Sequence, residues 1–412
     1  VSDPDGPALG IAITALDSSN GTWHFSTNNG STWNLVGAVS DTNALLLSAT
    51  NSRLYFRPTT ANFNGTISDA ITFKAWDGYT NGTWTGVNGG KADALNCGIN
   101  VAQYPLFCGI DADTLILPDA LLKVAMPFME DPERTVASGG TIRVANGCTI
   151  RGGQVVGVAF PENRVARFQV VEYLRAFLFG RVGWNLMGGT LIISGAFGLF
   201  KRQTAIDCGG YTHDTVGEDM ELVVKMHRKL REDGVPYRIV FVWDSACYTE
   251  VPEDLAVLGR QRDRWHRGLM DSVFRHRVMF MNRRYGIVGT IVFPFFAIFE
   301  MFGPLIELVG VVFVLFSFLF GVVDMPFMIL FLLVSVLFGV VLSVLSVMLE
   351  EVSYAAFDKW TDLLRICWYA VLENFGYRQL TVWWRVKGMW AFIRGQKQWG
   401  AMVRTGFGQP KP

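Results

Sequence analysis

A long apolar segment near the C-terminal end constrains this chain more than any other feature. From Gly286 to Leu349 the sequence contains no Lys or Arg. The acids within it are Glu300, Glu307 and Asp324. A helix needs roughly 20 apolar residues to cross a bilayer. Residues 305–323 and 327–349 meet this requirement, so we expect two membrane-spanning helices joined by a tight turn.

The charges that flank this segment predict its topology. The basic residues before it are Arg275, Arg277, Arg283 and Arg284. The basic residues after it are Arg378, Arg385, Lys387, Arg394 and Lys397. Because Lys and Arg favour the cytosolic side, both flanks should be cytosolic and the number of crossings should be even. Residues 287–303 then form a third span or an interfacial broken helix, and residues 363–384 lie in the interface unless both segments span.

The composition agrees with a membrane protein. Hydrophobic residues make up 50% of the 412 residues and charged residues 17%, a high and a low value for a soluble protein. The formal net charge is zero, so nothing predicts a nucleic-acid partner. The six Cys follow residue 86 without C-x-x-C spacing, which favours free thiols over a zinc site or a disulfide framework.

Residues 1–86 have the pattern of a β-domain. GIAITAL, TWHFST, RLYFRP and ITFKAW alternate apolar and polar residues with a period of two. Pairs such as Asn20-Gly21 and Asn64-Gly65 lie between these runs, and Asn-Gly accepts the positive φ angles of tight hairpins. We therefore expect an antiparallel β-sandwich.

From residue 87 the pattern becomes that of an α/β domain. The apolar run YPLFCGI ends at Asp111 and Asp113, and ligand sites in open α/β sheets gather at the carboxyl ends of strands. Two Asp separated by one residue would point to the same side of an extended strand and could share a divalent cation. The triplet by itself is a weak signal for a metal site.

Two further groups of polar residues follow in the chain. Glu218 and Asp219 open an amphipathic helix, where an Asp is either a capping residue or, if aimed into a pocket, a general base. Gln261, Arg264 and Trp265 share one face of a later helix. An arginine suits phosphate oxygens and a tryptophan can stack on a sugar. A basic helix at a membrane surface is the alternative interpretation.

The order of these motifs resembles that of the processive family 2 glycosyltransferases, which include cellulose, chitin, hyaluronan and poly-N-acetylglucosamine synthases. The motifs are GGKADALN, D-A-D, S-G-A-F, G-E-D and Q-R-D-R-W, followed by membrane spans. The resemblance implies a GT-A-like glycosyltransferase domain in residues 87–284, in the cytoplasm of a bacterium, and a multi-pass plasma-membrane region in residues 285–412. It implies inverting transfer of a sugar from a UDP-hexose or UDP-N-acetylhexosamine to a polysaccharide acceptor.

On the donor side, the resemblance implies roles for five residues. Asp111 and Asp113 match the pair that holds the nucleotide and a divalent cation, Mg or Mn. Lys91 matches a basic position near the diphosphate. Gln261 and Arg264 match the motif that braces the diphosphate.

On the acceptor side, Asp219 matches the general base that deprotonates the acceptor hydroxyl, with Glu218 beside it. Trp265 matches the residue that stacks on the acceptor. The loop that corresponds to the acceptor loop consists of Ser194, Gly195 and Ala196. It differs from the Phe-Cys-Gly form of the cellulose enzymes, which counts against cellulose as the product.

The acids of the apolar segment bear on the same function. Facing lipid, Glu300 and Glu307 would be costly. We expect them to face protein or a polysaccharide channel, or else to lie near a membrane interface.

Residues 1–86 carry a second resemblance. DPDG, RLYFRPTTANFNG and ANFNGTISDAITFKAWDG resemble the cadherin-like repeats of bacterial surface proteins. The matching acids, which would bind calcium, are Asp3, Asp5, Asp69 and Asp77. Asp also favours turns without any metal.

The two resemblances conflict where they meet. Residues 1–86 lack the first nucleotide-binding motifs of a family 2 transferase, and cadherin-like repeats work outside the cell. We therefore expect a chimeric chain, with a genuine fusion as the alternative, that transfers sugar slowly or not at all. Two other classes stay open: a calcium-binding surface adhesin, and a non-catalytic membrane transport or scaffold protein.

Overall fold

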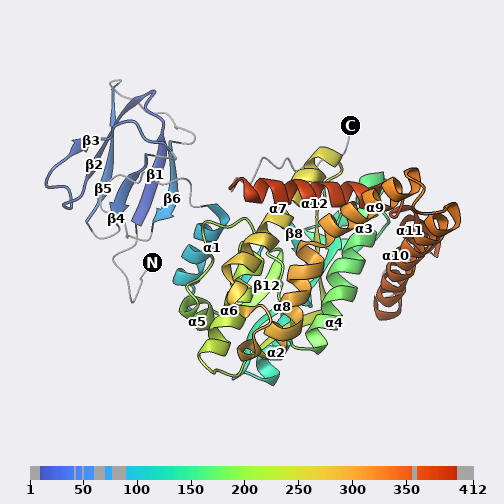
Figure 1. Ribbon diagram of the computed structural model, residues 1–412. Helices are drawn as coiled ribbons and strands as arrows, with labels where there is room; N and C mark the ends of the chain where they lie inside the picture. The colour runs from blue at the N-terminus through green and yellow to red at the C-terminus, as the bar shows by residue number, and fades with distance from the viewer. Residues whose placement is uncertain are drawn as a thin grey trace. The chain divides into compact units, whose positions relative to one another are not determined.

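The chain divides into two compact units, Val1–Tyr104 and Pro105–Pro412. Figure 1 labels their helices and strands in a computed structural model. It describes residues 10–40, 43–48, 51–59, 70–76, 90–354 and 360–396. The division lies beyond residue 86 because helix α1 (Gly90–Val101) contacts strand β6 (Ile71–Trp76) of the first unit.

The described strands of the first unit form two antiparallel sheets. One has the order β4-β1-β6 and the other β3-β2-β5. The remaining strands are β1 (Gly10–Leu16), β2 (Gly21–Ser26), β3 (Asn34–Leu35), β4 (Leu45–Ser48) and β5 (Arg53–Pro58). Ile13, Trp23 and Leu47 are buried, which accounts for the alternation in the sequence. The antiparallel pairing agrees with the prediction, and the sandwich itself stays a prediction. The proposed calcium ligands Asp3, Asp5, Asp69 and Asp77 lie outside the described residues.

A five-stranded mixed sheet is the centre of the second unit, with the order β7-β12-β9-β13-β8. Its strands are β7 (Leu106–Ile110), β8 (Thr114–Ile116), β9 (Thr135–Val144), β12 (Phe197–Lys201) and β13 (Arg238–Thr249). The long central strands β9 and β13 run parallel, and the other pairs are antiparallel. This sheet confirms the predicted α/β character of the region after residue 86. All six cysteines are free, as the sequence predicted.

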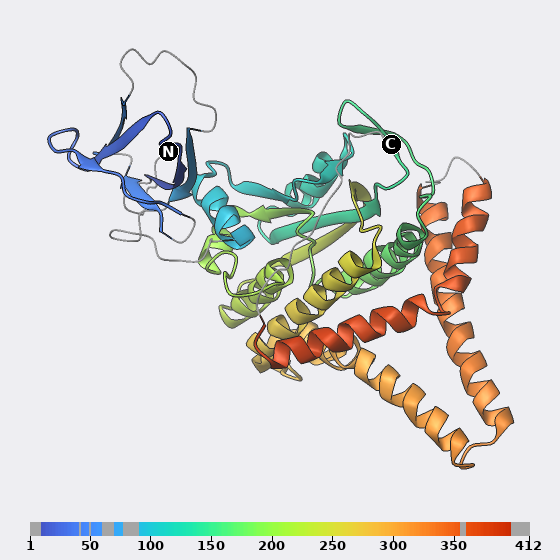
Figure 2. The ribbon, with the colours of Figure 1, turned by 90° about the horizontal axis from the view of Figure 1, so that it is seen from above.

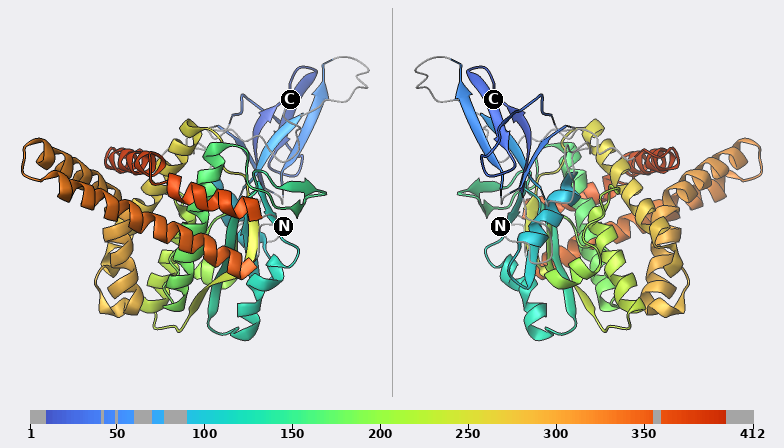
Figure 3. Two further views of the ribbon diagram at one scale, coloured as in Figure 1. Left: turned by 90° about the vertical axis from the view of Figure 1, so that its right-hand side faces the viewer. Right: turned by 90° about the vertical axis from the view of Figure 1, so that its left-hand side faces the viewer.

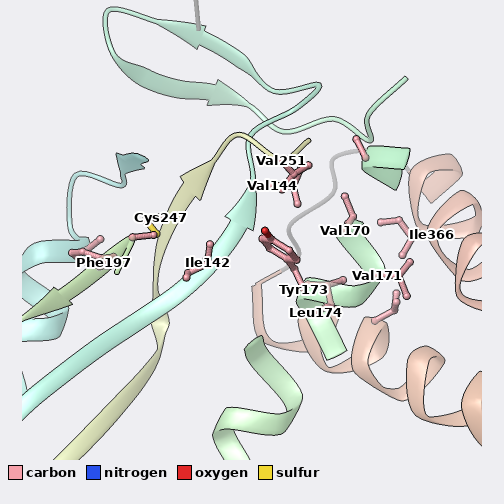
Figure 4. Close-up of a cluster of buried hydrophobic side chains, with 14 of the residues drawn as sticks. Ile142, Val144, Val170, Val171, Tyr173, Leu174, Phe197, Cys247, Val251 and Ile366 are labelled. Carbon is pink, nitrogen blue, oxygen red and sulfur yellow. The ribbon is translucent and has the colours of Figure 1, made fainter. Parts of the chain in front are cut away.

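Helices cover this sheet, and a small hairpin stands beside it. The helices before the apolar segment are α2 (Ala120–Glu130), α3 (Arg164–Tyr173), the π-helix η1 (Leu174–Phe179), α4 (Gly180–Leu186), α5 (Arg202–Asp207), α6 (Glu218–Glu232) and α7 (Leu255–Arg275). The hairpin consists of β10 (Thr149–Arg151) and β11 (Gln154–Gly157). Figure 4 shows the core between the sheet and the helices α3 and η1, where the Tyr173 ring of α3 points toward the strand β9 that carries Ile142 and Val144.

The apolar segment forms two helical arms that meet in a turn away from the sheet and diverge from that turn in Figure 2, and Figure 3 shows the arms from two further sides. One is α10 (Met325–Tyr354), whose residues Met325–Leu349 are long and apolar enough to cross a membrane, with a mean hydropathy of 3.0. The other is α9 (Gly303–Leu319), preceded by residues Val288–Met301 at an angle of 45°. That preceding segment is made of η4 (Val288–Val292), α8 (Phe293–Phe295) and η5 (Phe296–Met301).

The lengths of these helices limit how many membrane crossings the described residues can form. Among the described helices, α10 qualifies by itself, and a second span exists only if the bent pair is counted as one. Residues Val288–Met301 are helical and bend by 45° into α9, so the helix is broken at this point, and the choice between a third span and an interfacial helix stays a prediction. A multi-pass arrangement stays a prediction.

The predicted interfacial segment 363–384 is two helices rather than one. They are α11 (Trp360–Leu372) and α12 (Tyr377–Ile393). The chain turns between them at Gly376, whose φ of +94° is open to glycine at little cost. Helix α12 then lies along α7: a Cβ on Gly259 of α7 would come within 2.7 Å of Trp384, and one on Gly388 within 2.7 Å of the Asp263 carbonyl.

Two arginines of α12 bind the acids of the apolar segment. Arg378 donates through Nε and Nη2 to both oxygens of Glu307, at 2.9 and 3.1 Å. Arg385 binds the Glu300 carboxylate at 3.3 Å, seven residues further along α12. Both acids therefore contact protein, in agreement with the first interpretation, and a position near a membrane interface stays open as the second.

Candidate active site

The G-E-D motif opens helix α6 beside the S-G-A loop. The backbone N–H of Gly195 donates to Oδ2 of Asp219 at 3.1 Å, and the N–H of Met220 donates to Oδ1 at 2.8 Å. Glu218 is buried and Asp219 is partly exposed. The predicted base and the predicted acceptor loop, more than twenty residues apart in the chain, are thus in direct contact.

The loop reaches this position through a tight turn. Ser194 accepts from the N–H of Phe197 through its carbonyl, at 3.1 Å, and from the N–H of Ala196 through Oγ, at 3.3 Å. The turn leads directly into β12, an inner strand of the sheet between β7 and β9. The backbone donor of Gly195 is therefore held on a rigid element, as a binding loop requires.

The D-A-D triplet follows β7, next to β12 in the sheet. The N–H of Thr114 donates to the carbonyl of Asp111 at 3.0 Å, which closes a turn over Ala112 and Asp113. The prediction that both acids point to one side of an extended strand is therefore wrong, because the backbone turns between them. Asp favours such positions in turns.

Arg264 connects the acids electrostatically. Burial lowers the pKa of its guanidinium, and Glu218, Asp219 and Asp111 oppose that shift by favouring the charged form. Such interactions require the three carboxylates to lie near one arginine. The folded chain thus brings together residues from the D-A-D, G-E-D and Q-R-D-R-W motifs.

The other two predicted residues of α7 are held by protein contacts. Gln261 is buried, and its Oε1 accepts from Nη1 of Arg262 at 2.7 Å. Trp265 is partly buried; the Arg262 guanidinium lies 4.3 Å from its ring centroid, and the Phe177 ring lies at 5.9 Å. Arg262 itself binds Glu172 at 2.7 Å, so it fixes both neighbours from inside the protein.

Lys91 is the predicted site residue that belongs to the other compact unit of the chain. It lies in α1, in the first unit, whereas the remaining candidates all lie in the second. Its proposed contact with a diphosphate stays a prediction.

Two residues of the site were missed by sequence reasoning. Burial raises the pKa of the Tyr211 phenol, and Asp219 and Glu218 add to the shift, which places this side chain beside the acids. Arg181, in α4, is within electrostatic reach of Asp219. Tyr211 follows a Gly pair and Arg181 interrupts an apolar run, and neither signal is specific enough to select them.

The donor set near Asp111 fits a divalent cation that is shared with a substrate. Mg and Mn prefer oxygen ligands, and Mg is bound in many sites by one or two carboxylates together with phosphate oxygens. Asp111 and Asp113 offer two carboxylates within one turn. No cluster of three or more metal-ligating side chains occurs among the described residues, so the substrate would have to supply ligands.

Comparison with known proteins decides the family. The profile of "Glycosyl transferase family group 2" matches residues 107–349, more than half of the chain. The chain belongs to this family. The predicted enzyme class, a family 2 glycosyltransferase, is therefore confirmed, while the processive reaction and the cadherin-like repeat stay predictions.

Two curated synthases are similar in sequence to this chain. The chain is 33% identical over 190 residues to the poly-beta-1,6-N-acetyl-D-glucosamine synthase of Staphylococcus aureus (strain COL), covering 46% of this chain and 40% of that protein. It is 31% identical over 189 residues to the synthase of the same name from Staphylococcus epidermidis, covering 46% and 41%. The chain thus spans less than half the length of these relatives.

Among solved structures, the mannosyltransferase PcManGT from Pyrobaculum calidifontis, in complex with GDP-Man and Mn2+, aligns with a TM-score of 0.39. The sequence identity is 16%, and the alignment covers 74% of this chain and 67% of that one.

Proposed function

We propose that the second unit transfers a sugar, with inversion, from a UDP-linked hexose or N-acetylhexosamine to the end of a growing polysaccharide. The observation that carries this proposal is the hydrogen bond from the Gly195 N–H to Asp219, with the Arg264 guanidinium nearby. It places a candidate base, a candidate acceptor loop and an arginine suited to phosphate in one site. Membership of the family and the identity to two poly-N-acetylglucosamine synthases support it. They favour N-acetylglucosamine as the sugar.

In this mechanism Asp219 is the general base. Its carboxylate takes the proton from the acceptor hydroxyl, the hydroxyl oxygen bonds to the anomeric carbon, and the bond from that carbon to the diphosphate breaks. The hydrogen bond from Gly195 holds one carboxylate oxygen in place, so the base is oriented before the acceptor arrives. Glu218 contributes charge beside Asp219.

The leaving nucleoside diphosphate is an anion that needs compensating charge. Arg264 supplies a guanidinium that suits phosphate oxygens, and Gln261, one helical turn before it on α7, would help to brace the diphosphate. Asp111 and Asp113 would hold a divalent cation, Mg or Mn, which neutralises phosphate charge when it is bound. Trp265 would present the part of its ring that Arg262 leaves open to the acceptor.

We further propose a multi-pass arrangement in a bacterial plasma membrane, with the second unit's sheet in the cytoplasm. Helix α10 and the bent pair before it supply two crossings, an even number that agrees with the basic residues on both flanks. Turnover should be slow, because a β-domain stands where the resemblance leads us to expect the first nucleotide-binding strand.

A direct assay tests the proposal. The 412-residue chain, purified in detergent, is incubated with radiolabelled UDP-N-acetylglucosamine, Mn and a β-1,6-linked N-acetylglucosamine oligosaccharide. We expect slow, chelator-sensitive extension of the oligosaccharide and less extension with GDP-mannose as donor. Extension that is insensitive to chelation argues against the cation, and rates equal to those of an intact synthase argue against the expected impairment.

A further inference from the structure

Arg181 is the one arginine beside the proposed base that no sequence motif predicted. It lies in the first turn of α4, and its guanidinium carbon is 4.7 Å from the centroid of the Phe177 ring and 5.9 Å from that of Phe241. Asp219 and Cys247 interact with it electrostatically. The side chain thus lies among two rings, the sheet and the base.

The position of Arg181 follows from how α4 is attached to the sheet. Asn185, one helical turn later, accepts through Oδ1 from the backbone N–H of Phe241 in β13, at 2.8 Å. Residues four apart lie on the same face of a helix, so Arg181 faces the sheet as well. The π-helix η1 precedes α4, and π-helical turns are frequent at functional sites.

The Arg181 guanidinium is charged and has hydrogen-bond donors that are available to a ligand. Burial lowers the pKa of Arg181 to about 10, so it stays charged at neutral pH. Within the part of the chain that the structure describes, its guanidinium makes ring contacts but no hydrogen bond. A guanidinium carries five N–H donors, and those of Arg181 are not shut off from solvent, so they can donate to a ligand or to water.

The ring of Phe177 connects Arg181 to the predicted acceptor platform. It contacts the guanidinium on one side and the Trp265 ring, at 5.9 Å, on the other. Arg181, Phe177 and Trp265 therefore form a row of contacts, and the guanidinium at its end is within electrostatic reach of Asp219. Aromatic rings with an adjacent hydrogen-bond donor are suited to a sugar, which offers an apolar face and hydroxyl oxygens.

We propose that Arg181 contacts the acceptor: its N–H groups donate to hydroxyl oxygens of the terminal sugar of the polysaccharide and orient the attacking hydroxyl toward Asp219. This inference rests on the proposed function for the identity of the ligand. It assigns to α4 and η1 a part of the acceptor site that the family's sequence motifs do not contain.

The test is a binding measurement, which needs no turnover. A β-1,6-linked N-acetylglucosamine pentasaccharide is titrated into the full chain in detergent micelles and followed by saturation-transfer NMR. Replacing Arg181→Met removes the donors and keeps the apolar stem, and we expect affinity to fall about tenfold or more. Arg181→Lys should give an intermediate loss. Arg228→Met, which removes an arginine paired with Glu232 on α6, is the matched control and should bind normally.

The outcomes separate this inference from the proposed function. Pentasaccharide binding that is equal in Arg181→Met, or absent in the unsubstituted chain, overturns the role of Arg181. A loss of UDP affinity with unchanged pentasaccharide affinity also overturns it, because Arg181 would then contact the donor. If pentasaccharide binding depends on Arg181 but the chain transfers no sugar, the acceptor site is supported and the proposed transfer reaction is contradicted. If Arg181→Met does not fold, the affinity of Arg181→Lys decides.

Discussion

Gly217, the residue before helix α6, packs backbone to backbone against Gly268 of α7. A Cβ on Gly268 would lie 2.7 Å from the Gly217 Cα and 3.0 Å from its nitrogen. The proposed base Asp219 follows two residues after this contact, and Arg264 precedes Gly268 by one helical turn. The close approach of two glycines thus sets the distance between the base and the phosphate-binding arginine.

Replacing Gly268→Ala should therefore separate the two helices at the site. We expect transfer to fall by tenfold or more, because a shift of the order of 1 Å in a positioned group can cost as much as a hundredfold. The free energy of unfolding should fall by about 1–3 kcal/mol, as for other overpacked sites. The measurements are labelled-sugar incorporation and thermal unfolding in detergent.

Gly310→Ala is the matched control, since a Cβ there meets nothing within 4 Å and the residue lies inside helix α9, outside the proposed site. Alanine in a helix interior should stabilise it by about 0.5–1 kcal/mol. If Gly268→Ala transfers sugar as well as Gly310→Ala, the glycine contact does not control the site.

The buried pair of Glu172 and Arg262 should make stability depend on pH. Burial acts to raise the pKa of the Glu172 carboxyl, but Arg262 and Tyr377 lower it more, so it lies below its ordinary value of 4.5. The folded protein then holds the carboxylate ionised at a pH where the unfolded chain takes up a proton. The stabilisation is present above about pH 4.5 and is lost as the pH falls through the lower value of the folded state.

Glu172→Gln should remove this part of the pH dependence. It should also lower the free energy of unfolding at pH 7 by about 3–5 kcal/mol, because Arg262 is left with an uncompensated buried charge. Unfolding midpoints measured from pH 7 to pH 3 test both effects. The exposed Glu162→Gln is the control, and an identical pH profile for the two variants would argue against a structural role for the pair.

The contact of α12 with the apolar arm should respond to charge reversal. Arg378 binds both carboxylate oxygens of Glu307, and both side chains are partly exposed. Arg378→Glu should lower the free energy of unfolding by about 1 kcal/mol or less, in the range of half-exposed pairs. The double variant Arg378→Glu with Glu307→Arg should recover most of that loss. A double variant less stable than either single one would show that the pair does not hold the arm.

The order of the acidic motifs predicted which residues come near one another, while their roles stay predictions. Asp111 follows strand β7 and Asp219 lies in the first turn of α6, and both interact electrostatically with Arg264 in the middle of α7. The predicted local geometry of the D-A-D triplet was wrong. Strand β7 ends at Ile110, so the triplet lies in the turn that follows the strand. An apolar strand pattern cannot by itself show where pairing stops.

Other features of the fold and the site could not be predicted because they depend on packing between segments that are distant in the sequence. Arg181 reaches the site because Asn185 fixes α4 to β13, and no spacing in the sequence records that contact. Residues 363–384 were open to more than one interpretation because Trp and Tyr suit both an interface and a span. The break at Gly376 and the packing of α12 on α7 make them two helices in the structure.

The measurement that tests the central claim most directly is sugar transfer by Asp219→Asn. Asn keeps the shape of the side chain and one oxygen that can accept from the Gly195 N–H, but it cannot take a proton, so the account predicts a loss of about 10²–10⁴-fold. Asp214→Asn, which alters an exposed carboxylate paired with Arg275, should transfer like the unsubstituted chain. UDP binding should be the same in all three. Transfer by Asp219→Asn at the rate of Asp214→Asn would contradict the assignment of the base.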